Sequence, residues 1–396
     1  MSAPLSVAEA RAAMLAAATA LESESVALAD ALQRVLAAPV VSSRDQPPFA
    51  VSAMDGYAIR AADTPGTLAL IGESAAGHGF DGRCGAGQAV RISTGAAIPS
   101  GADTVVIQED VRRDGDNVEV PAVKPNANIR PQGGDFQADV ELLAQGRKLD
   151  GVALSLAAAA GRAELSVMQR PRIAILSSGD ELAPPGAEPG PWQIFESATF
   201  GVAALVREWG GKPTKLAIEK DDIDSIARAA DEGLFSSDLL VVIGGASVGD
   251  HDHARAALMS LGLKPLVEKV AVRPGKPTWF GVTSIGPVLG LPGNPASALV
   301  CAHLFLKPIM EKMLGRDPVV HFRKARLARA LPANGPREHY LRARLESDEN
   351  GQVTVRSFED QDSSLHSVFA AANALIRLPP NAPAMNEGTL VEVLML

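Results

Sequence analysis

Three stretches of sequence decide the fold, because each joins a short apolar run to a polar loop that contains glycine. They are 172–182 RIAILSSGDEL, 239–250 LLVVIGGASVGD and 288–297 VLGLPGNPAS. Short apolar runs bounded by turn residues are typical of buried parallel strands. Helical patterns lie between them, so the chain from Arg172 to about Leu314 alternates strands with helices. This alternation predicts a doubly wound α/β sheet.

The expected elements of this sheet follow from the pattern. The strands are Ile173–Leu176, Thr214–Ile218, Leu239–Ile243 and Val288–Leu291, and the helices are Ser197–Trp209, Asp224–Glu232, Ala254–Leu261 and Ala296–Leu314. After Pro318 the pattern changes to alternating strands with polar turns, which predicts a small C-terminal β-barrel or sandwich. Its expected strands are Arg323–Arg329, Tyr340–Leu345, Val353–Phe358, Leu375–Leu378 and Leu390–Leu394.

The N-terminal part predicts helices and then a glycine-rich β domain. Ser6 and Glu9 form a capping box before an alanine-rich helix, and a second helix is expected over Leu28–Leu36. Asp45–Ala62 is expected to be mostly loop. The apolar runs Leu68–Ile71, Val90–Ile92, Thr104–Ile107 and Val118–Val120 have hairpin spacing. We expect a mixed linker domain over 1–45 and 136–170, a β-rich domain over 46–135, the α/β domain over 171–320 and the barrel over 321–396.

Composition limits the class of protein. A chain of 396 residues, 46% hydrophobic and 21% charged, is a multidomain globular protein. The net charge of −9 argues against nucleic-acid binding by bulk attraction. Cys84 and Cys301 lie too far apart in sequence for a disulfide framework, which favours a reducing cytoplasm. Ala12–Leu21 lies between Glu9 and Glu22, so we expect a helix there rather than a signal peptide, and no membrane partner.

The loops at the ends of the predicted parallel strands are the candidate binding site. In an open α/β sheet ligands bind at the carboxyl ends of the strands, where loops lead into helix N-termini. The loops are 177–182, 244–250 and 292–297. One such loop is more often a structural turn, but three in one sheet, two with carboxylates, favour a phosphorylated ligand with a metal. The chain has no P-loop pattern, and 85–87 GAG lacks the third glycine of a dinucleotide-binding turn.

Charged residues near these loops leave several interpretations open. Residues 250–253 read DHDH, and Asp250 with Asp252 could hold Mg²⁺ together with substrate phosphate. Helix capping without a metal and a His-x-His zinc site are the alternatives. In 272–277 VRPGKP, Arg273 and Lys276 provide a counter-charge for an anion or form a solvated turn. The segments 52–58 SAMDGYA and 91–96 RISTGA indicate ordered loops and nothing more on their own.

Taken in order, these segments resemble the molybdopterin molybdenumtransferases, or molybdate insertases. The matching segments are 47–49 PPF, 52–58 SAMDGYA, 94–96 TGA, 129–131 IRP with Gly133 and Asp135, 178–182 SGDEL, Gly244 and Gly245 with 247–249 SVG, 274–277 PGKP and 291–295 LPGNP. The resemblance implies an elongated four-domain homodimer whose central domain is similar to the molybdopterin adenylyltransferase. It also implies that adenylylated molybdopterin and molybdate are converted, with Mg²⁺, to molybdenum cofactor and AMP. Molybdopterin adenylyltransferase and molybdoenzyme maturation factors are the expected partners.

The resemblance assigns roles to named residues. It implies catalytic roles for Asp55, Thr94, Asp135, Glu181, Asp221 and Asp252, and metal binding by Asp250 and Asp252. It implies ligand binding by Ser178, Gly179, Gly244, Gly245, Ser247, Gly249, Arg273, Lys276, Pro292, Gly293, Asn294 and Pro295. The site is expected between the α/β domain of one subunit and the β domain of its partner.

The chain also departs from the family pattern. Ala50 and Val51 replace Asp-Asn, Glu196 and Ala198 flank Ser197 where Asp and Asn are usual, Gly134 replaces an acid, Ile243 a serine and Arg273 a lysine. An asparagine replaced by alanine loses its hydrogen-bonding groups outright. Two hypotheses follow: an active insertase, or a divergent paralogue that keeps the fold and binds a molybdopterin-like or nucleotide ligand or acts as a scaffold. An unrelated nucleotide-binding hydrolase is a third alternative.

Overall fold

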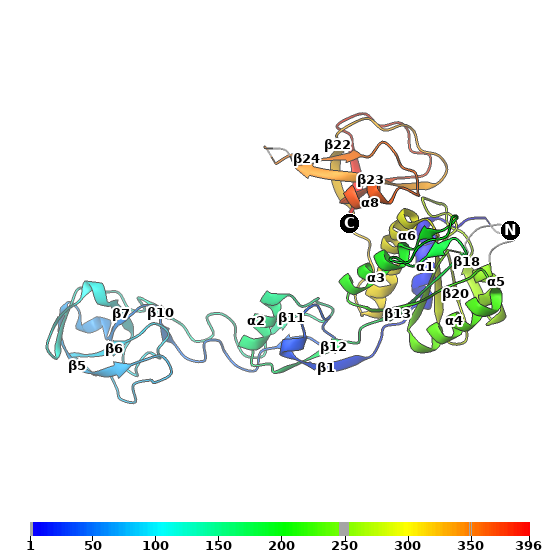
Figure 1. Cartoon of the computed structure of the whole chain (residues 1–396). Helices are drawn as coiled ribbons and strands as arrows, with labels where there is room; N and C mark the ends of the chain where they lie inside the picture. The colour runs from blue at the N-terminus through cyan, green and yellow to red at the C-terminus, as the bar shows by residue number, and fades with distance from the viewer. Residues whose placement is uncertain (1–2, 245–252, 348, 350) are drawn as a thin grey trace. The chain divides into compact units, whose positions relative to one another are not determined.

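The structure is a computed structural model that describes residues 3–244, 253–347, 349 and 351–396. The chain forms two compact units (Figure 1). The first unit consists of Met1–Glu24, Gln33–Ala37 and Val167–Leu396, and the second of Ser25–Leu32 and Ala38–Ser166. No helix in the described ranges is both long enough and apolar enough to cross a membrane.

The first unit contains a six-stranded sheet in the order β16-β13-β17-β21-β20-β18. Its strands are β13 (Arg172–Ser178), β16 (Lys212–Glu219), β17 (Leu239–Ile243), β18 (Lys264–Val267), β20 (Trp279–Val282) and β21 (Pro287–Leu291). The strands β16, β13, β17 and β21 are parallel, and β20 and β18 continue the sheet in antiparallel pairings. The four parallel strands are those that the sequence pattern predicts, and β20 is the strand expected directly after the 272–277 turn, whereas β18 was not anticipated.

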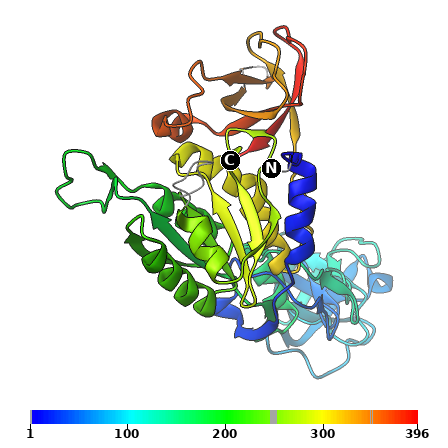
Figure 2. The same cartoon turned by 90° about the vertical axis from the view of Figure 1, so that its right-hand side faces the viewer.

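Helices cover both faces of this sheet (Figure 2). They are α1 (Val7–Ala17), α3 (Ala198–Glu208), α4 (Ile223–Ser236), α5 (His253–Ser260), α6 (Pro295–Cys301) and α7 (Lys307–Met313), with a π-helical turn over Ala302–Leu306. Alternate residues of each strand enter different cores. Ile173 and Val241 pack with α1, α3, α6 and α7, while Ala174 and Leu240 pack with α4 and α5. The doubly wound α/β fold is confirmed.

The C-terminal strands of the first unit close into a five-stranded barrel. The ring runs β23-β24-β22-β26-β25 and returns to β23, with the two-residue β19 (Val272–Arg273) added at β23. The strands are β22 (Arg323–Leu327), β23 (Glu338–Ser347), β24 (Val353–Ser357), β25 (Ala374–Leu378) and β26 (Leu390–Met395), with the short helix α8 (His366–Ala371). The barrel interior holds Leu341, Val355 and Ile376, whereas Tyr340 and Leu375 pack into the α/β core.

The second unit contains a six-stranded sheet in the order β7-β4-β6-β5-β9-β8. Its strands are β4 (Gly56–Ile59), β5 (Gly66–Ser74), β6 (Gln88–Ile92), β7 (Thr104–Ile107), β8 (Arg112–Asp114) and β9 (Asn117–Val120). Smaller elements are β2 (Val40–Val41), β3 (Val51–Ser52), β10 (Ile129–Arg130), β11 (Glu141–Leu143) and α2 (Gly151–Ala159). The paired strands β1 (Ser23–Ala27) and β12 (Glu164–Met168) run through the boundary of the two units.

Two expectations for the N-terminal part are wrong, and a third is incomplete. The segment Asp45–Ala62 is mostly loop, as expected, but it also contains β4, a buried central strand that the pattern did not predict. Gly56 made the sequence pattern there resemble a turn rather than a strand. The strand nevertheless needs glycine at this position, because a Cβ would lie 1.9 Å from the carbonyl oxygen of Val106. The helix expected over Leu28–Leu36 is one 3₁₀ turn (Leu28–Asp30), because Gln33 has φ +63. Not all neighbouring runs form hairpins, since β5 and β6 are parallel.

Candidate functional site

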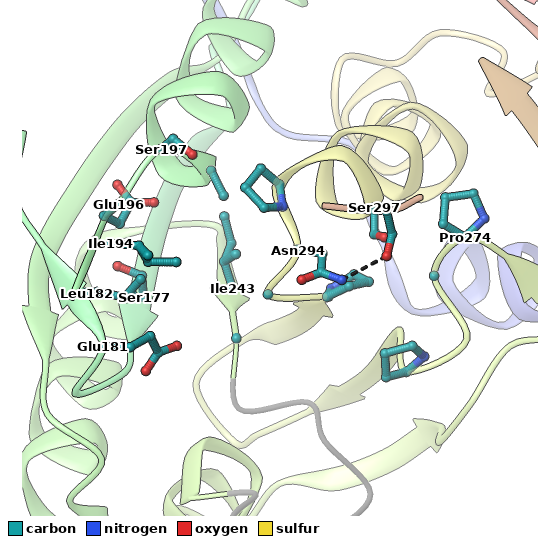
Figure 3. Close-up of a pocket in the computed structure, with 18 of the residues that line it drawn as sticks. Ser177, Glu181, Leu182, Ile194, Glu196, Ser197, Ile243, Pro274, Asn294 and Ser297 are labelled. Atoms are coloured by element: carbon teal, nitrogen blue, oxygen red, sulfur yellow. Dashed lines mark hydrogen bonds between the residues drawn. The ribbon is translucent and has the colours of Figure 1, made fainter. Parts of the chain in front are cut away.

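A pocket of about 740 Å³ opens at the carboxyl ends of β13, β17 and β21 in the first unit. The residues that line it from the α/β part are Ser177, Ser178, Glu181, Leu182, Ile194, Phe195, Glu196, Ser197, Ala198, Asp221, Ile243, Gly244, Arg273–Pro277, Pro292–Pro295 and Ser297. Figure 3 shows Ser177, Glu181 and Glu196 on one side of this pocket and Asn294, Ser297 and Pro274 on the other. The pocket therefore lies where the loop pattern predicts a ligand site.

Serine hydroxyls and carboxylates lie where β13 ends. Ser177 and Ser178 are buried, and the Ser178 hydroxyl finds no hydrogen-bond partner within the described part of the chain. A buried polar atom without a partner is unfavourable unless a ligand or solvent group satisfies it. Glu181 and Asp221 are exposed to the pocket, so this end of the site contains both hydroxyl groups and acidic groups.

Glu196 organises the start of α3. Its carboxylate is buried, and it accepts hydrogen bonds from the backbone N–H of Thr199 at 2.7 Å and from the Thr199 hydroxyl at 2.6 Å. The side chain thus caps α3, because it satisfies an N–H group that has no partner within the helix. Ala198 and Ile243 line the pocket nearby, so two of the departures from the family pattern give the wall apolar side chains.

A second group of lining residues comes from the C-terminal barrel, and the sequence did not identify them. They are Arg337, Gln361, Asp362 and Ser363. The side-chain amide of Asn294 donates a 2.8 Å hydrogen bond to the Ser363 hydroxyl, which joins the loop before α6 to the barrel. The polar run 359–364 EDQDSS directly after a predicted strand was the one signal available for this wall.

Buried Arg342 fixes this barrel loop. Its Nη1 donates to the backbone carbonyls of Asp362 at 2.9 Å and Leu365 at 3.2 Å, and its Nε and backbone N–H donate to the Gln361 side chain. The hydroxyl and N–H of Ser364 hold the pKa of the Asp362 carboxyl below its usual range. The loop therefore presents an ionised carboxylate to the pocket.

Positive charge lies along the side of the pocket formed by 273–277 and the start of β23. Arg273 and Lys276 are exposed and line the pocket, as does Arg337, whose Nη1 donates to the carbonyl of Val272 at 3.4 Å. Three cations near one another favour an anionic ligand. The predicted counter-charge is present at the pocket, with one more arginine than the sequence indicated.

Two of the predicted residues of the second unit lie beside strands of its sheet, since Asp55 directly precedes β4 and Thr94 follows β6. The Asp55 carboxylate accepts a 2.6 Å hydrogen bond from the backbone N–H of Thr94, and this bond is the main cause of a lowered pKa of Asp55. Asp135 lies in a separate turn, where its backbone N–H donates to the carbonyl of Gln46. Asp55 and Thr94 are thus brought together, and no described contact joins Asp135 to them.

The remaining predicted residues divide into two groups. Gly179 lines a separate, neighbouring pocket of about 650 Å³ rather than the main one. Gly245, Ser247, Gly249, Asp250 and Asp252 lie outside the described residues.

Within the described ranges no group of three or more His, Cys, Asp or Glu side chains could hold a metal ion. Mg²⁺ needs only one or two carboxylates beside substrate phosphate, so exposed Glu181 and Asp221 fit such an ion chemically.

A doubly wound sheet with a polar, cationic pocket at its parallel strand ends defines a class of proteins that bind anionic small molecules. Family models place the chain within that class. Residues 5–161 match the MoeA N-terminal region, domains I and II, residues 174–312 match the model described as "Probable molybdopterin binding domain", and residues 324–396 match the MoeA C-terminal region, domain IV.

Individual relatives agree with these models. The chain is 35% identical to a molybdopterin molybdenumtransferase of Nostoc sp. over 95% of this chain and 89% of the relative. It is 34% identical to one of Haemophilus influenzae over 94% and 93% of the two chains. The crystal structure of a molybdopterin biosynthesis MoeA protein from Pyrococcus horikoshii superposes with a TM-score of 0.87 at 29% identity, covering 99% of both chains. The chain belongs to the molybdopterin molybdenumtransferase family, a family of transferases, as the sequence motifs predicted.

Proposed function

We propose that this chain acts in molybdenum cofactor biosynthesis as a molybdate insertase, which inserts molybdate into adenylylated molybdopterin and releases AMP. The observation behind the proposal is the main pocket of the first unit, which collects Ser178, Glu181, Asp221, Gly244, Arg273, Lys276, Pro292, Gly293, Asn294 and Pro295. Family membership supports the substrate class, since the related transferases are named for molybdopterin.

We assign a different role to the cationic, hydroxyl and acidic residues of the pocket. Arg273, Lys276 and Arg337 offset the negative charge of molybdate and of the phosphoanhydride as it is cleaved. The Ser178 hydroxyl has no described partner and becomes available to a substrate oxygen. Glu181 and Asp221 orient the attacking and leaving oxygens from the opposite end of the pocket.

Mg²⁺ is the expected metal of this reaction, with Asp250 and Asp252 as its proposed ligands and a phosphate oxygen as a further one. When bound, the ion would act as a Lewis acid on the phosphoanhydride. The test measures cofactor formation against Mg²⁺ concentration for wild type and Asp252→Asn. A rightward shift of the Mg²⁺ curve with a tenfold to thousandfold lower maximum is expected, and superimposed curves would exclude these carboxylates as the metal site.

We further propose that the enzyme is a homodimer in which the Asp55 turn of one subunit completes the pocket of the other. Asp55 is exposed, ionised and held by Thr94, which is an arrangement suited to meeting a ligand. Asp55→Ala and Lys276→Ala homodimers should each lose most activity. Mixed dimers of the two variants contain one intact site of two and should regain about half of wild-type activity. An equimolar mixture after random subunit exchange should regain about a quarter, because only half of its dimers are mixed. No recovery in mixed dimers would contradict the shared site.

The second candidate function, a divergent paralogue that binds without efficient insertion, is favoured by one observation. Ala198 and Ile243 place apolar side chains in the pocket wall where the family pattern has polar ones. Expression in a strain that lacks its own insertase decides between the two, because only an active insertase restores molybdoenzyme activity. If the chain restores molybdoenzyme activity only weakly, the Ala198→Asn variant should be tested in the same strain. A gain of several fold in restored activity would show that Ala198 limits insertion.

A further inference from the structure

The turn that presents Lys276 is held from behind by one buried hydroxyl. Thr278 is fully buried, and its Oγ1 lies 2.8 Å from the carbonyl oxygen of Gly275, which also accepts the backbone N–H of Thr278 at 3.0 Å. The backbone N–H of Val270 donates to the carbonyl of Lys276 at 3.1 Å. The backbone on both sides of the Lys276 side chain is therefore fixed by hydrogen bonds.

The same hydroxyl connects this turn to α6. Thr278 Oγ1 lies 3.2 Å from the sulfur of Cys301, the last residue of α6. A Cβ on Gly275 would lie 2.2 Å from that sulfur, so the turn packs directly on the thiol. Burial raises the pKa of Cys301 to about 12, so the thiol stays neutral and takes a packing and hydrogen-bonding role.

The connection matters because α6 also meets the pocket at its other end. Pro295 and Ser297 of α6 line the pocket, as does Asn294 just before it. Thr278 and Cys301 thus tie the turn with the cations to the helix whose first turn lines the same side of the pocket (Figure 3). A lysine on an untethered turn would have to be ordered when the ligand binds, and that ordering costs affinity.

We propose that Thr278 is a positioning residue for Lys276, acting with Cys301 to hold the ammonium group where an anionic ligand binds. The inference rests on the proposed function for the identity of that ligand. It involves no contact between Thr278 and substrate, since Thr278 is fully buried and does not line the pocket.

A double-mutant cycle on the full-length protein tests the proposal, with AMP as the probe and calorimetric titration as the measurement. Lys276→Gln should weaken AMP binding about tenfold or more, and Thr278→Val, which keeps the shape and removes the hydroxyl, about threefold to tenfold. In the Lys276→Gln background Thr278→Val should change affinity less than twofold. Thr278→Ser retains the hydroxyl and should stay within twofold of wild type.

Thr283→Val is the matched control. The Thr283 hydroxyl also closes a turn, since it lies 3.0 Å from the carbonyl of Gly286 and accepts the N–H groups of Ile285 and Gly286, yet Thr283 does not line the pocket. This variant should lose comparable stability without losing AMP affinity. An equal affinity loss for Thr278→Val in both Lys276 backgrounds would overturn the proposal.

Hydrogen exchange separates this inference from the proposed function, because it needs no ligand. Thr278→Val should accelerate exchange of the Val270 and Thr278 amides about tenfold or more, and Thr278→Ser should not. Unchanged exchange would show that the hydroxyl does not hold the turn. Failure of wild type to bind AMP would instead contradict the proposed ligand, while exchange would still decide whether Thr278 positions Lys276.

Discussion

The α/β side and the barrel side of the pocket hold their polar groups in different ways. On the α/β side Ser178 is the last residue of the buried parallel strand β13 and Gly244 directly follows β17, so the sheet itself fixes their positions. On the barrel side Gln361 and Asp362 lie on an irregular loop, which depends on the buried guanidinium of Arg342. The first arrangement arises from backbone topology, and the second from a few hydrogen bonds between residues distant in sequence.

This difference predicts where each side is sensitive to substitution. Changes on the α/β side should act through steric fit and charge at a rigid surface. Changes on the barrel side should act through the order of one loop, with smaller effects on the chemistry.

The largest effect is expected for Gly275→Ala on the α/β side. The new Cβ would lie 2.2 Å from the sulfur of Cys301, and φ is +113, so both packing and backbone conformation oppose the substitution. We expect the free energy of unfolding to fall by about 3–5 kcal/mol, measured by urea denaturation.

Two variants separate the causes of that loss. Gly262→Ala has a similar backbone constraint, φ +80, but nothing within 4 Å of the Cβ, and should cost about 1–2 kcal/mol. Gly275→Ala combined with Cys301→Ala removes the sulfur and should recover part of the loss. No recovery would mean that the contact with Cys301 does not set the cost.

The next prediction compares the loss of one cation on the α/β side with the loss of one cation on the barrel side. Lys276→Gln should lower kcat/KM for cofactor formation about a hundredfold, the scale of one preorganised charge. Arg337→Gln should lower it only about tenfold, because this guanidinium already donates to the carbonyl of Val272 and belongs to the barrel side. Equal losses of kcat/KM for the two variants would show that the cations of the α/β side and the barrel side contribute equally to catalysis. The proposed difference between the two sides would then not hold for charged residues.

The sequence predicted the α/β side well for a physical reason. Apolar runs such as Leu239–Ile243 and the loops after them are local patterns, and parallel topology places their ends together. The barrel side could not be predicted, since the partners Arg342 and Gln361 belong to different segments and meet only after the barrel closes. Central strand β4 was missed for a related reason, because the need for Gly56 arises from its neighbour strand β7.

Gln361→Leu tests how far the barrel wall depends on its hydrogen bonds. The Gln361 side chain accepts from the backbone N–H of Arg342 at 2.9 Å and from its Nε at 3.3 Å, and it donates to the carbonyls of Arg342 and Phe358. Leucine removes all four, so we expect a loss of about 1–3 kcal/mol in unfolding free energy. Proteolysis between 358 and 365 should also become faster. Stability equal to wild type would mean that Arg342 holds the loop without Gln361.

The last effect is a pH dependence of stability that originates on the barrel side and is confined to acidic pH. Burial, followed by the charges of Arg273, Arg337 and Arg342, lowers the pKa of His339 to about 4 from 6.5. Between these two values the unfolded chain binds a proton that the folded chain does not, so the contribution of neutral His339 is present above pH 6.5 and is lost as the pH falls toward 4. His339→Gln should therefore reduce the acid-side decline of the unfolding free energy by roughly 1–3 kcal/mol across this window. Urea denaturation at half-unit pH steps measures it, with exposed His321→Gln as the control. If His339→Gln and wild type decline in parallel from pH 6.5 to 4, the barrel side is not where acid destabilises the protein.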